Sequence, residues 1–122
     1  MKAARLIVWF SVVSFVLIVI GAVFAFVGLG VLPVSRGVLV QWESAIYGAI
    51  MMGWGVTLFL VGRIAFRRGD QELLRALLYG VVVWLIVEAL FSAYLGVWFN
   101  VGVDLIVLLL FGLPLVTRLR SR

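Results

Sequence analysis

Two carboxyl groups stand inside otherwise apolar stretches of the sequence and are the side chains best able to do chemistry. Glu88 is the only charged residue between Ala76 and Val103, and Asp104 lies early in the apolar stretch that follows. A carboxyl group among apolar residues is stable only when it is protonated, paired with a cation, hydrogen-bonded or in contact with water. The two acids are therefore expected to face the interior of a helix bundle, where one of these conditions is met.

Polar and aromatic residues recur at helical spacing around these acids. Ser92 lies one helical turn after Glu88, and Trp84 lies one turn before it. Asn100 lies one turn before Asp104. We predict a small polar pocket that is open to the outside of the cell and is lined by these residues, with Glu43, Tyr47, Gln41, Arg36 and an aromatic floor made of Trp54 and Trp84.

Three interpretations of Glu88 stay open at this point. The carboxyl can bind a ligand or an ion, with Glu43 and Asp104 attracting a cation at the mouth of the pocket. It can instead belong to a satisfied hydrogen-bond network with Ser92, Tyr47 or Arg36 that only holds helices together. It can also lie against a partner subunit.

The composition excludes several other chemistries. The sequence has no Cys and no His, and Lys2 is its only lysine. Thiol nucleophiles, imidazole catalysis and the usual zinc, copper and haem ligand sets are therefore missing. We expect no metal site and no cofactor. Glu88 with Asp104 is the only pair that could act as acid and base on a lipid, and we do not expect an enzyme.

The overall composition is that of a membrane protein. Of the 122 residues, 66% are hydrophobic and 12% are charged, and the mean hydropathy is +1.33, whereas a soluble domain is about 25% charged. A spanning helix needs about 20 apolar residues, so the length suits four spans in one domain over residues 1–122. The spans at about residues 6–32, 43–66, 73–96 and 101–117 predict an all-α integral membrane four-helix bundle.

The first apolar run is too long for a secretory signal. Residues 23–25 form a passable cleavage site, but residues 6–32 far exceed the roughly 7 to 15 residues of a signal-peptide apolar region. We interpret the run as a retained helix that Pro33 ends. Residues 33–41 are predicted to form a loop whose apolar side chains lie along the membrane surface.

Glycine, proline and polar residues predict where the later helices end. Gly69 is a candidate C-cap of the second span, and Asp70 is a candidate N-cap of the third. A compact turn through residues 98–102 is expected to join the last two spans. Pro114 removes one backbone hydrogen bond from the fourth span and predicts a kink there.

Basic residues are distributed unevenly about the predicted spans. Nine of the ten fall on one side and Arg36 alone falls on the other, which places both termini in the cytoplasm of a multi-pass protein of the cell (inner) membrane. The same bias explains the basic patches, so we expect contact with anionic lipid headgroups and no nucleic-acid partner. The nine residues are Lys2, Arg5, Arg63, Arg67, Arg68, Arg75, Arg118, Arg120 and Arg122.

Small residues recur every seven positions in the first two spans. These stripes are Ser14, Gly21 and Gly28 in the first span and Gly48, Gly55 and Gly62 in the second. Helices in a bilayer approach closely at small residues, so we predict an antiparallel, left-handed pair. A glycine-lined substrate path is the alternative. A further small-residue face at Ala45, Ala49 and Gly53 could meet another span or a second copy of the chain.

Several short motifs are spread between Gly53 and Pro114. They are Gly53-Trp54-Gly55, Ala65-Phe66-Arg67-Arg68, Trp84 with Glu88 and Ser92, Asn100-Val101, and Leu113-Pro114. In these motifs about half of the chain resembles uncharacterised small bacterial four-helix membrane proteins of the DoxX-like or BphX-like kind. The resemblance implies a four-helix bundle and supplies no activity.

Two functions are compatible with these features. The first is a protein that binds or transports a small cationic or amphipathic molecule, a proton or a cation in the pocket around Glu88. The second is a structural or assembly subunit of a larger membrane complex, with no activity of its own. The expected partners are the lipid bilayer and either further copies of the chain or other membrane subunits.

Overall fold

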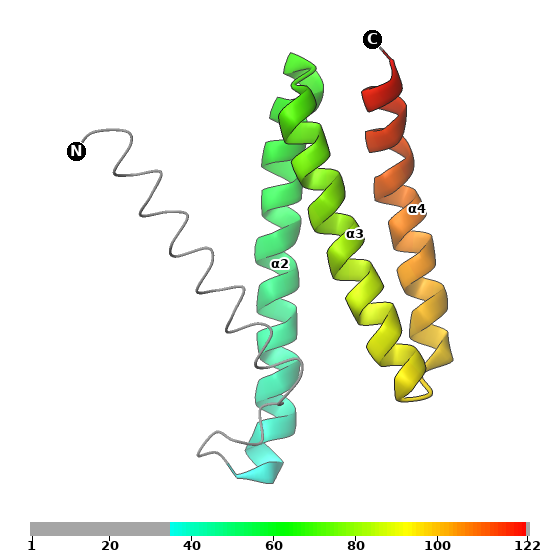
Figure 1. Ribbon diagram of the computed structural model, residues 1–122. Helices are drawn as coiled ribbons and strands as arrows, with labels where there is room; N and C mark the ends of the chain where they lie inside the picture. Colours follow the sequence, from blue (N-terminus) through cyan, green and yellow to red (C-terminus); the bar gives the residue numbers. More distant parts are fainter. Residues whose placement is uncertain (1–34, 122) are drawn as a thin grey trace, which may run out of the picture. The chain divides into compact units, whose positions relative to one another are not determined.

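The computed structural model describes residues 35–121, and this part of the chain is helical apart from short turns. Helix α2 spans Arg36–Arg68, α3 spans Gln71–Tyr94 and α4 spans Trp98–Arg120 (Figure 1). All three are long and apolar enough to cross a membrane. At about 1.5 Å per residue, α3 and α4 each exceed the roughly 30 Å of a bilayer's hydrocarbon core. The described helices therefore indicate an all-helical membrane protein, and the predicted first span at 6–32 lies outside the described residues.

Two predicted connections differ from the structure. The loop expected at residues 33–41 is wrong over 36–41, because α2 already begins at Arg36. The turn expected at 98–102 is also wrong, because α4 begins at Trp98. Both segments are rich in apolar side chains. A helix satisfies its own backbone hydrogen bonds, whereas a loop at the membrane surface would need water to satisfy them. The helices therefore continue to within a few residues of each reversal.

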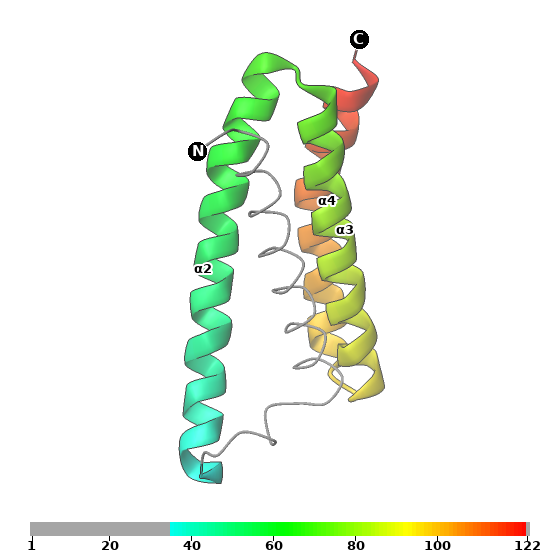
Figure 2. The same ribbon diagram turned by 60° about the vertical axis from the view of Figure 1, so that its left-hand side comes forward.

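The chain divides into two compact units, Met1–Ile50 and Met51–Arg122, with the division inside α2. The first unit contributes the amino-terminal half of α2 to the described residues. The second contains the rest of α2 and the antiparallel hairpin of α3 and α4, which lie side by side in both views (Figures 1 and 2). The prediction of a single four-span domain stays a prediction.

The second unit has a narrow apolar core. Its α3 residues are spaced three or four positions apart and form one helical face. That face packs against two residues of α2 and one of α4, and the buried set is Leu58, Ala65, Leu74, Leu77, Val81, Leu85 and Leu115. Most other large apolar side chains of these helices are exposed. Such an outward apolar surface suits lipid and does not suit water.

The side chain of Trp54 in α2 reaches Gly80 in α3. A Cβ atom at Gly80 would lie 3.3 Å from Cη2 of Trp54, so the indole ring packs where a side chain would otherwise stand. The indole Nε1 is buried and has no hydrogen-bond partner. The sequence analysis did not single out Gly80, because its neighbours form a plain run of valines and leucines with no small-residue repeat.

The predicted caps at the α2–α3 turn are confirmed. Gly69 has a φ of +62°, which glycine adopts without steric cost. The Asp70 backbone N–H donates to the Ala65 carbonyl at a distance of 3.1 Å, and this bond closes the end of α2. The Asp70 side chain then accepts from the backbone N–H groups of Glu72 and Leu73, both at 3.1 Å, as the N-cap of α3.

The α3–α4 turn uses the same backbone arrangement. Gly96 has a φ of +75°. Its N–H donates to the Ala93 carbonyl at 3.1 Å, and the Val97 N–H donates to the Ser92 carbonyl at 2.7 Å. These two bonds form a Schellman motif, which ends α3 sharply and sends α4 back along it.

The glycine stripe of α2 faces no described atoms. A Cβ atom at Gly48, Gly55 or Gly62 would meet nothing described within 4 Å, and the same holds at Gly53. The predicted partners Ser14, Gly21 and Gly28 lie outside the described residues, so the close packing of the first two spans stays a prediction. Pro114 lies inside α4 as expected.

Candidate functional site: an acid and amide cluster between α3 and α4

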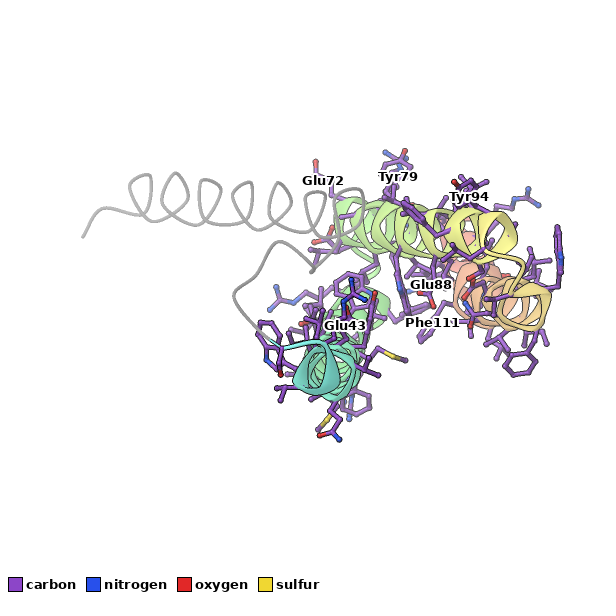
Figure 3. The ribbon with its side chains drawn as sticks, turned by 90° about the horizontal axis from the view of Figure 1, so that it is seen from below. Glu43, Glu72, Tyr79, Glu88, Tyr94 and Phe111 are labelled. Carbon is purple, nitrogen blue, oxygen red and sulfur yellow. The ribbon has the colours of Figure 1, made fainter. Side chains whose placement is uncertain are left out.

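Asn100 joins two carboxyl groups and a hydroxyl near the α3–α4 turn. Its side-chain Nδ2 donates to Ser92 Oγ at 2.9 Å, to Asp104 Oδ2 at 3.2 Å and to Glu88 Oε1 at 3.4 Å. Figure 3 views the molecule from the end that carries this turn and labels Glu88. We call these four residues the acid–amide cluster. It connects α3, which supplies Glu88 and Ser92, to α4, which supplies Asn100 and Asp104.

The turn explains why the two acids meet. Gly96 lies midway in the sequence between Glu88 and Asp104, so antiparallel helices leaving the turn bring both acids to the same level. At about 1.5 Å per residue, that level is roughly 12 Å from the turn along either helix. The short Schellman turn leaves little freedom to slide one helix past the other. The geometry of a local backbone motif therefore fixes the spacing of the site.

The cluster has more acceptors than its central amide can serve at full strength. A side-chain amide has two N–H groups, and here three acceptors lie within hydrogen-bond distance of one nitrogen. The shortest bond goes to the Ser92 hydroxyl, and the longest goes to Glu88. Glu88 is therefore the member that the amide holds least tightly.

Burial differs between the two acids. Asp104 is 3% exposed and is the only buried charged or polar residue in the part of the chain that the structure describes. Glu88, Ser92 and Asn100 are half-buried. A small species entering from outside the cluster would therefore meet Glu88 and Asn100 before it met Asp104.

The segment that carries the acid–amide cluster contains no basic residue. Residues 76–117 contain Glu88 and Asp104 and no Lys, Arg or His. Within residues 35–121, neither acid lies within 4.0 Å of a basic nitrogen. Two negative charges that share one amide donor repel each other strongly in apolar surroundings. A proton or a cation must therefore offset at least part of this charge.

Exposed aromatic side chains lie at the α3–α4 turn. Tyr94 and Phe99 are the most exposed of the large apolar side chains, at 85% and 82%, and Leu95 and Trp98 beside them are also exposed. Amphipathic rings of this kind prefer the boundary between headgroups and hydrocarbon. If the turn lies at that boundary, the cluster lies within the outer part of one bilayer leaflet.

The predicted aromatic floor has its two members in the second unit. Trp54 packs against Gly80, and Trp84 is half-buried against the apolar core one helical turn from Glu88. The remaining predicted members belong to the first unit, where Arg36, Gln41 and Tyr47 are exposed and Glu43 is half-buried. Their participation in the site stays a prediction.

Arg118 has a role that the sequence analysis missed. One guanidinium nitrogen donates to the Phe66 carbonyl at 3.3 Å, and a Cβ atom at Gly69 would lie 3.2 Å from it. Arg118 thus ties the end of α4 to the end of α2. In the sequence it counted only toward the charge bias, and nothing local distinguishes it from Arg120.

The described residues contain no group of three or more His, Cys, Asp or Glu side chains that could hold a metal ion. The acid–amide cluster offers carboxylate, amide and hydroxyl oxygens only. These atoms suit a proton or a weakly coordinated cation better than a transition metal.

Comparison of the sequence with protein-family models and with curated proteins finds no match, and comparison with solved structures finds none either. The resemblance to DoxX-like or BphX-like proteins stays a prediction.

Proposed function

We propose that this chain is a membrane protein that binds a small cation between α3 and α4, with the acid–amide cluster as its binding site. The observation that supports this proposal is the pairing of Glu88 and Asp104 on the single amide of Asn100 in a segment without basic residues. Such a pair needs a positive charge, and a bound cation or an exchangeable proton provides it.

Each member of the cluster has a distinct part in this proposal. Glu88 is half-buried and has the longest bond to Asn100, so its carboxyl group is the one that meets the cation. Asp104 is buried, and because burial disfavours a charged carboxyl group, the proton that the pair shares resides on Asp104. Asn100 holds both acids at a fixed separation, and Ser92 competes for the same amide. Cation binding therefore coincides with proton release from the cluster.

The favoured ligands are organic or amphipathic cations that partition to the membrane boundary. The exposed aromatic side chains at the α3–α4 turn offer apolar and cation–π contact on the way to the cluster. Trp84, one turn below Glu88, offers a further ring beyond the acids. An alkali ion would gain nothing from these rings. In this proposal the α3–α4 turn faces outside the cell.

The test uses tetraphenylphosphonium as the probe and measures its binding to the purified protein by equilibrium dialysis. Glu88→Gln removes the carboxyl group that meets the cation and keeps the shape of the side chain. We expect this variant to lose at least about tenfold in affinity, which corresponds to about 1.4 kcal/mol. The wild-type protein is expected to release protons on binding in weakly buffered solution, and the variant is not.

The matched control is Glu72→Gln, which removes an exposed acid from the first turn of α3. It changes the net charge by the same amount and leaves the cluster intact. We expect it to bind the probe as the wild type does. Equal binding by the wild type and Glu88→Gln would contradict the proposal.

A second candidate function is that of a structural subunit in a larger membrane complex. The observation that favours it is the direction of the Asn100 bonds, all of which join α3 and α4 to each other or stay within α4. A network of this kind stabilises a helix pair without any ligand. Native mass spectrometry after gentle extraction separates the two functions. A fixed complex with other polypeptides supports the subunit, and a lone chain or homo-oligomer with a retained cationic mass supports the binding protein.

A further inference from the structure

The end of the second unit opposite the acid–amide cluster carries a group of arginines. The end of α2, the start of α3 and the end of α4 come together there (Figures 1 and 2). The hydrogen bond from Arg118 to the Phe66 carbonyl fixes the α4 end against the α2 end. We call the following residues the arginine cluster: Arg67, Arg68, Arg75, Arg118 and Arg120.

Most of these arginines are available to a partner. Arg67, Arg68, Arg75 and Arg120 are exposed, and Arg118 is half-buried. Within the described residues, none of the five has a carboxylate within 4.0 Å. Two acids lie nearby in the sequence: Asp70 already accepts two backbone N–H groups as a helix cap, and Glu72 is a single exposed carboxyl group beside five arginines. The cluster therefore has positive charge that the protein itself does not neutralise.

Arg63 is a useful contrast and is not part of the cluster. Its guanidinium lies 5.3 Å from the centre of the Phe59 ring, one helical turn earlier in α2. That contact directs the charge back along the helix. The exposed arginines after it have no such ring contact in the described part of the chain, so their charge remains available at the helix ends.

The length of the helices places the arginine cluster at the depth of lipid phosphates. Helices α3 and α4 each exceed the roughly 30 Å of the hydrocarbon core by about one turn. The start of α3 and the end of α4 therefore reach the headgroup layer. A guanidinium binds a phosphate through two parallel N–H donors, which makes arginine better suited to this contact than lysine.

We infer that the arginine cluster binds the headgroup phosphate of an anionic phospholipid and selects it over a zwitterionic one. Several guanidinium groups on the ends of three helices converge on one level of the bilayer, where a lipid phosphate lies at the required depth. The net positive charge then distinguishes phosphatidylglycerol from phosphatidylcholine, whose choline group would be repelled. A bound lipid of this kind would join α2 and α4 through their arginines, beside the direct contact made by Arg118.

The experiment is native mass spectrometry of the full chain in micelles that contain equal amounts of phosphatidylglycerol and phosphatidylcholine with identical acyl chains. The wild type is expected to retain phosphatidylglycerol at least about tenfold more often. The double variant Arg67→Gln with Arg68→Gln removes two exposed arginines, and each juxtamembrane arginine changes anionic-lipid binding by about fivefold. We therefore expect the preference to fall by at least about tenfold.

Two controls keep the result specific. Arg36→Gln removes one arginine from the opposite terminus of α2 and should change the preference by less than about twofold, whereas Arg68→Gln alone should lower it by about fivefold. Helix content by circular dichroism should be the same in all variants, because these side chains are exposed.

Two results would overturn the inference. The first is an unchanged preference for phosphatidylglycerol in the double variant. The second is binding of inorganic phosphate or of a short oligonucleotide to the wild type as tightly as phosphatidylglycerol, because the arginine cluster would then recognise a soluble phosphate and not a lipid.

Discussion

The α2–α3 turn and the α3–α4 turn reverse the chain in the same way and differ in their side chains. Each contains a glycine with a positive φ, Gly69 and Gly96, followed by a backbone bond that closes the preceding helix. At the first turn the glycine lies against Arg118, which reaches over from α4. At the second turn a Cβ atom on the glycine would meet nothing described within 4 Å.

The charges at the two turns are arranged in opposite ways. At the α2–α3 turn, the arginine side chains are exposed, Asp70 serves as a cap, and Glu72 is exposed in the first turn of α3. Near the α3–α4 turn, the acids are drawn between the helices onto an amide, with no basic residue in residues 76–117. Charge that faces headgroups needs no internal partner, whereas charge between helices must be offset. The first turn is therefore suited to anchoring and the second to binding.

Asn100→Leu tests the pairing of the acids near the α3–α4 turn and should lower the free energy of unfolding most. The change leaves Glu88 and Asp104 without their shared donor, and an unsatisfied charged group between helices is costly. Because interhelical hydrogen bonds in membranes are worth less than their number suggests, we expect a loss of about 2 kcal/mol. Unfolding in mixed detergent micelles measures it.

The matched control for Asn100→Leu is Thr57→Val. The Thr57 hydroxyl donates to the Gly53 carbonyl of its own helix at 2.9 Å and is exposed. Its loss leaves no orphaned charge, and the free energy of unfolding should change by less than about 0.5 kcal/mol. If the two variants lost the same stability, the amide would not be holding the acids.

The sequence predicts local interactions at the turns better than contacts between helices. The cap residues Gly69 and Asp70 were predicted correctly because each acts on backbone within five residues. The roles of Arg118 and Gly80 were not, because their contacts depend on which helix packs at their level.

The acid–amide cluster falls between these cases. Glu88 and Asp104 were assigned to one pocket from the sequence, but their position at the same level follows from the reversal at Gly96, which the sequence analysis had put at residues 98–102. The central position of Asn100 could not be predicted, since it depends on one side-chain rotamer, and the residue was assigned to a turn that the structure replaces with the first residues of α4. The starts of α2 and α4 were missed because apolar residues beside a proline or glycine suit a helix as well as a surface loop.

Alanine at the two turn glycines should separate backbone strain from side-chain contact. Gly69→Ala and Gly96→Ala both place a Cβ atom in the left-handed region, which costs about 1 kcal/mol at each position. At Gly69 the new Cβ would also lie 3.2 Å from the Arg118 guanidinium and disturb its bond to Phe66. We expect about 1 kcal/mol of additional loss there.

The measurement for these glycines is again unfolding in mixed micelles. Combining Gly69→Ala with Arg118→Gln should remove the additional loss, since no guanidinium remains to be displaced. If Gly69→Ala and Gly96→Ala were equally destabilising, the contact of Arg118 with the first turn would contribute nothing, and the two turns would differ only in charge.

Gly80→Ala tests how α2 is held against α3 between the two turns, and it should have the smallest net effect. The new Cβ would lie 3.3 Å from the Trp54 ring, and the resulting overpacking costs about 1 kcal/mol. Alanine in a helix regains about 1 kcal/mol relative to glycine, so the net change in stability should be close to zero.

Gly102→Ala in α4 is the matched control, because its Cβ would meet nothing within 4 Å among described atoms and only the helix gain remains. Gly80→Ala should also shift the tryptophan fluorescence spectrum, since the buried indole N–H of Trp54 would move, and Gly102→Ala should leave the spectrum unchanged. Equal stabilisation by both variants, with no spectral shift, would mean that Trp54 does not pack on Gly80 and that α2 is held to α3 at the arginine end alone.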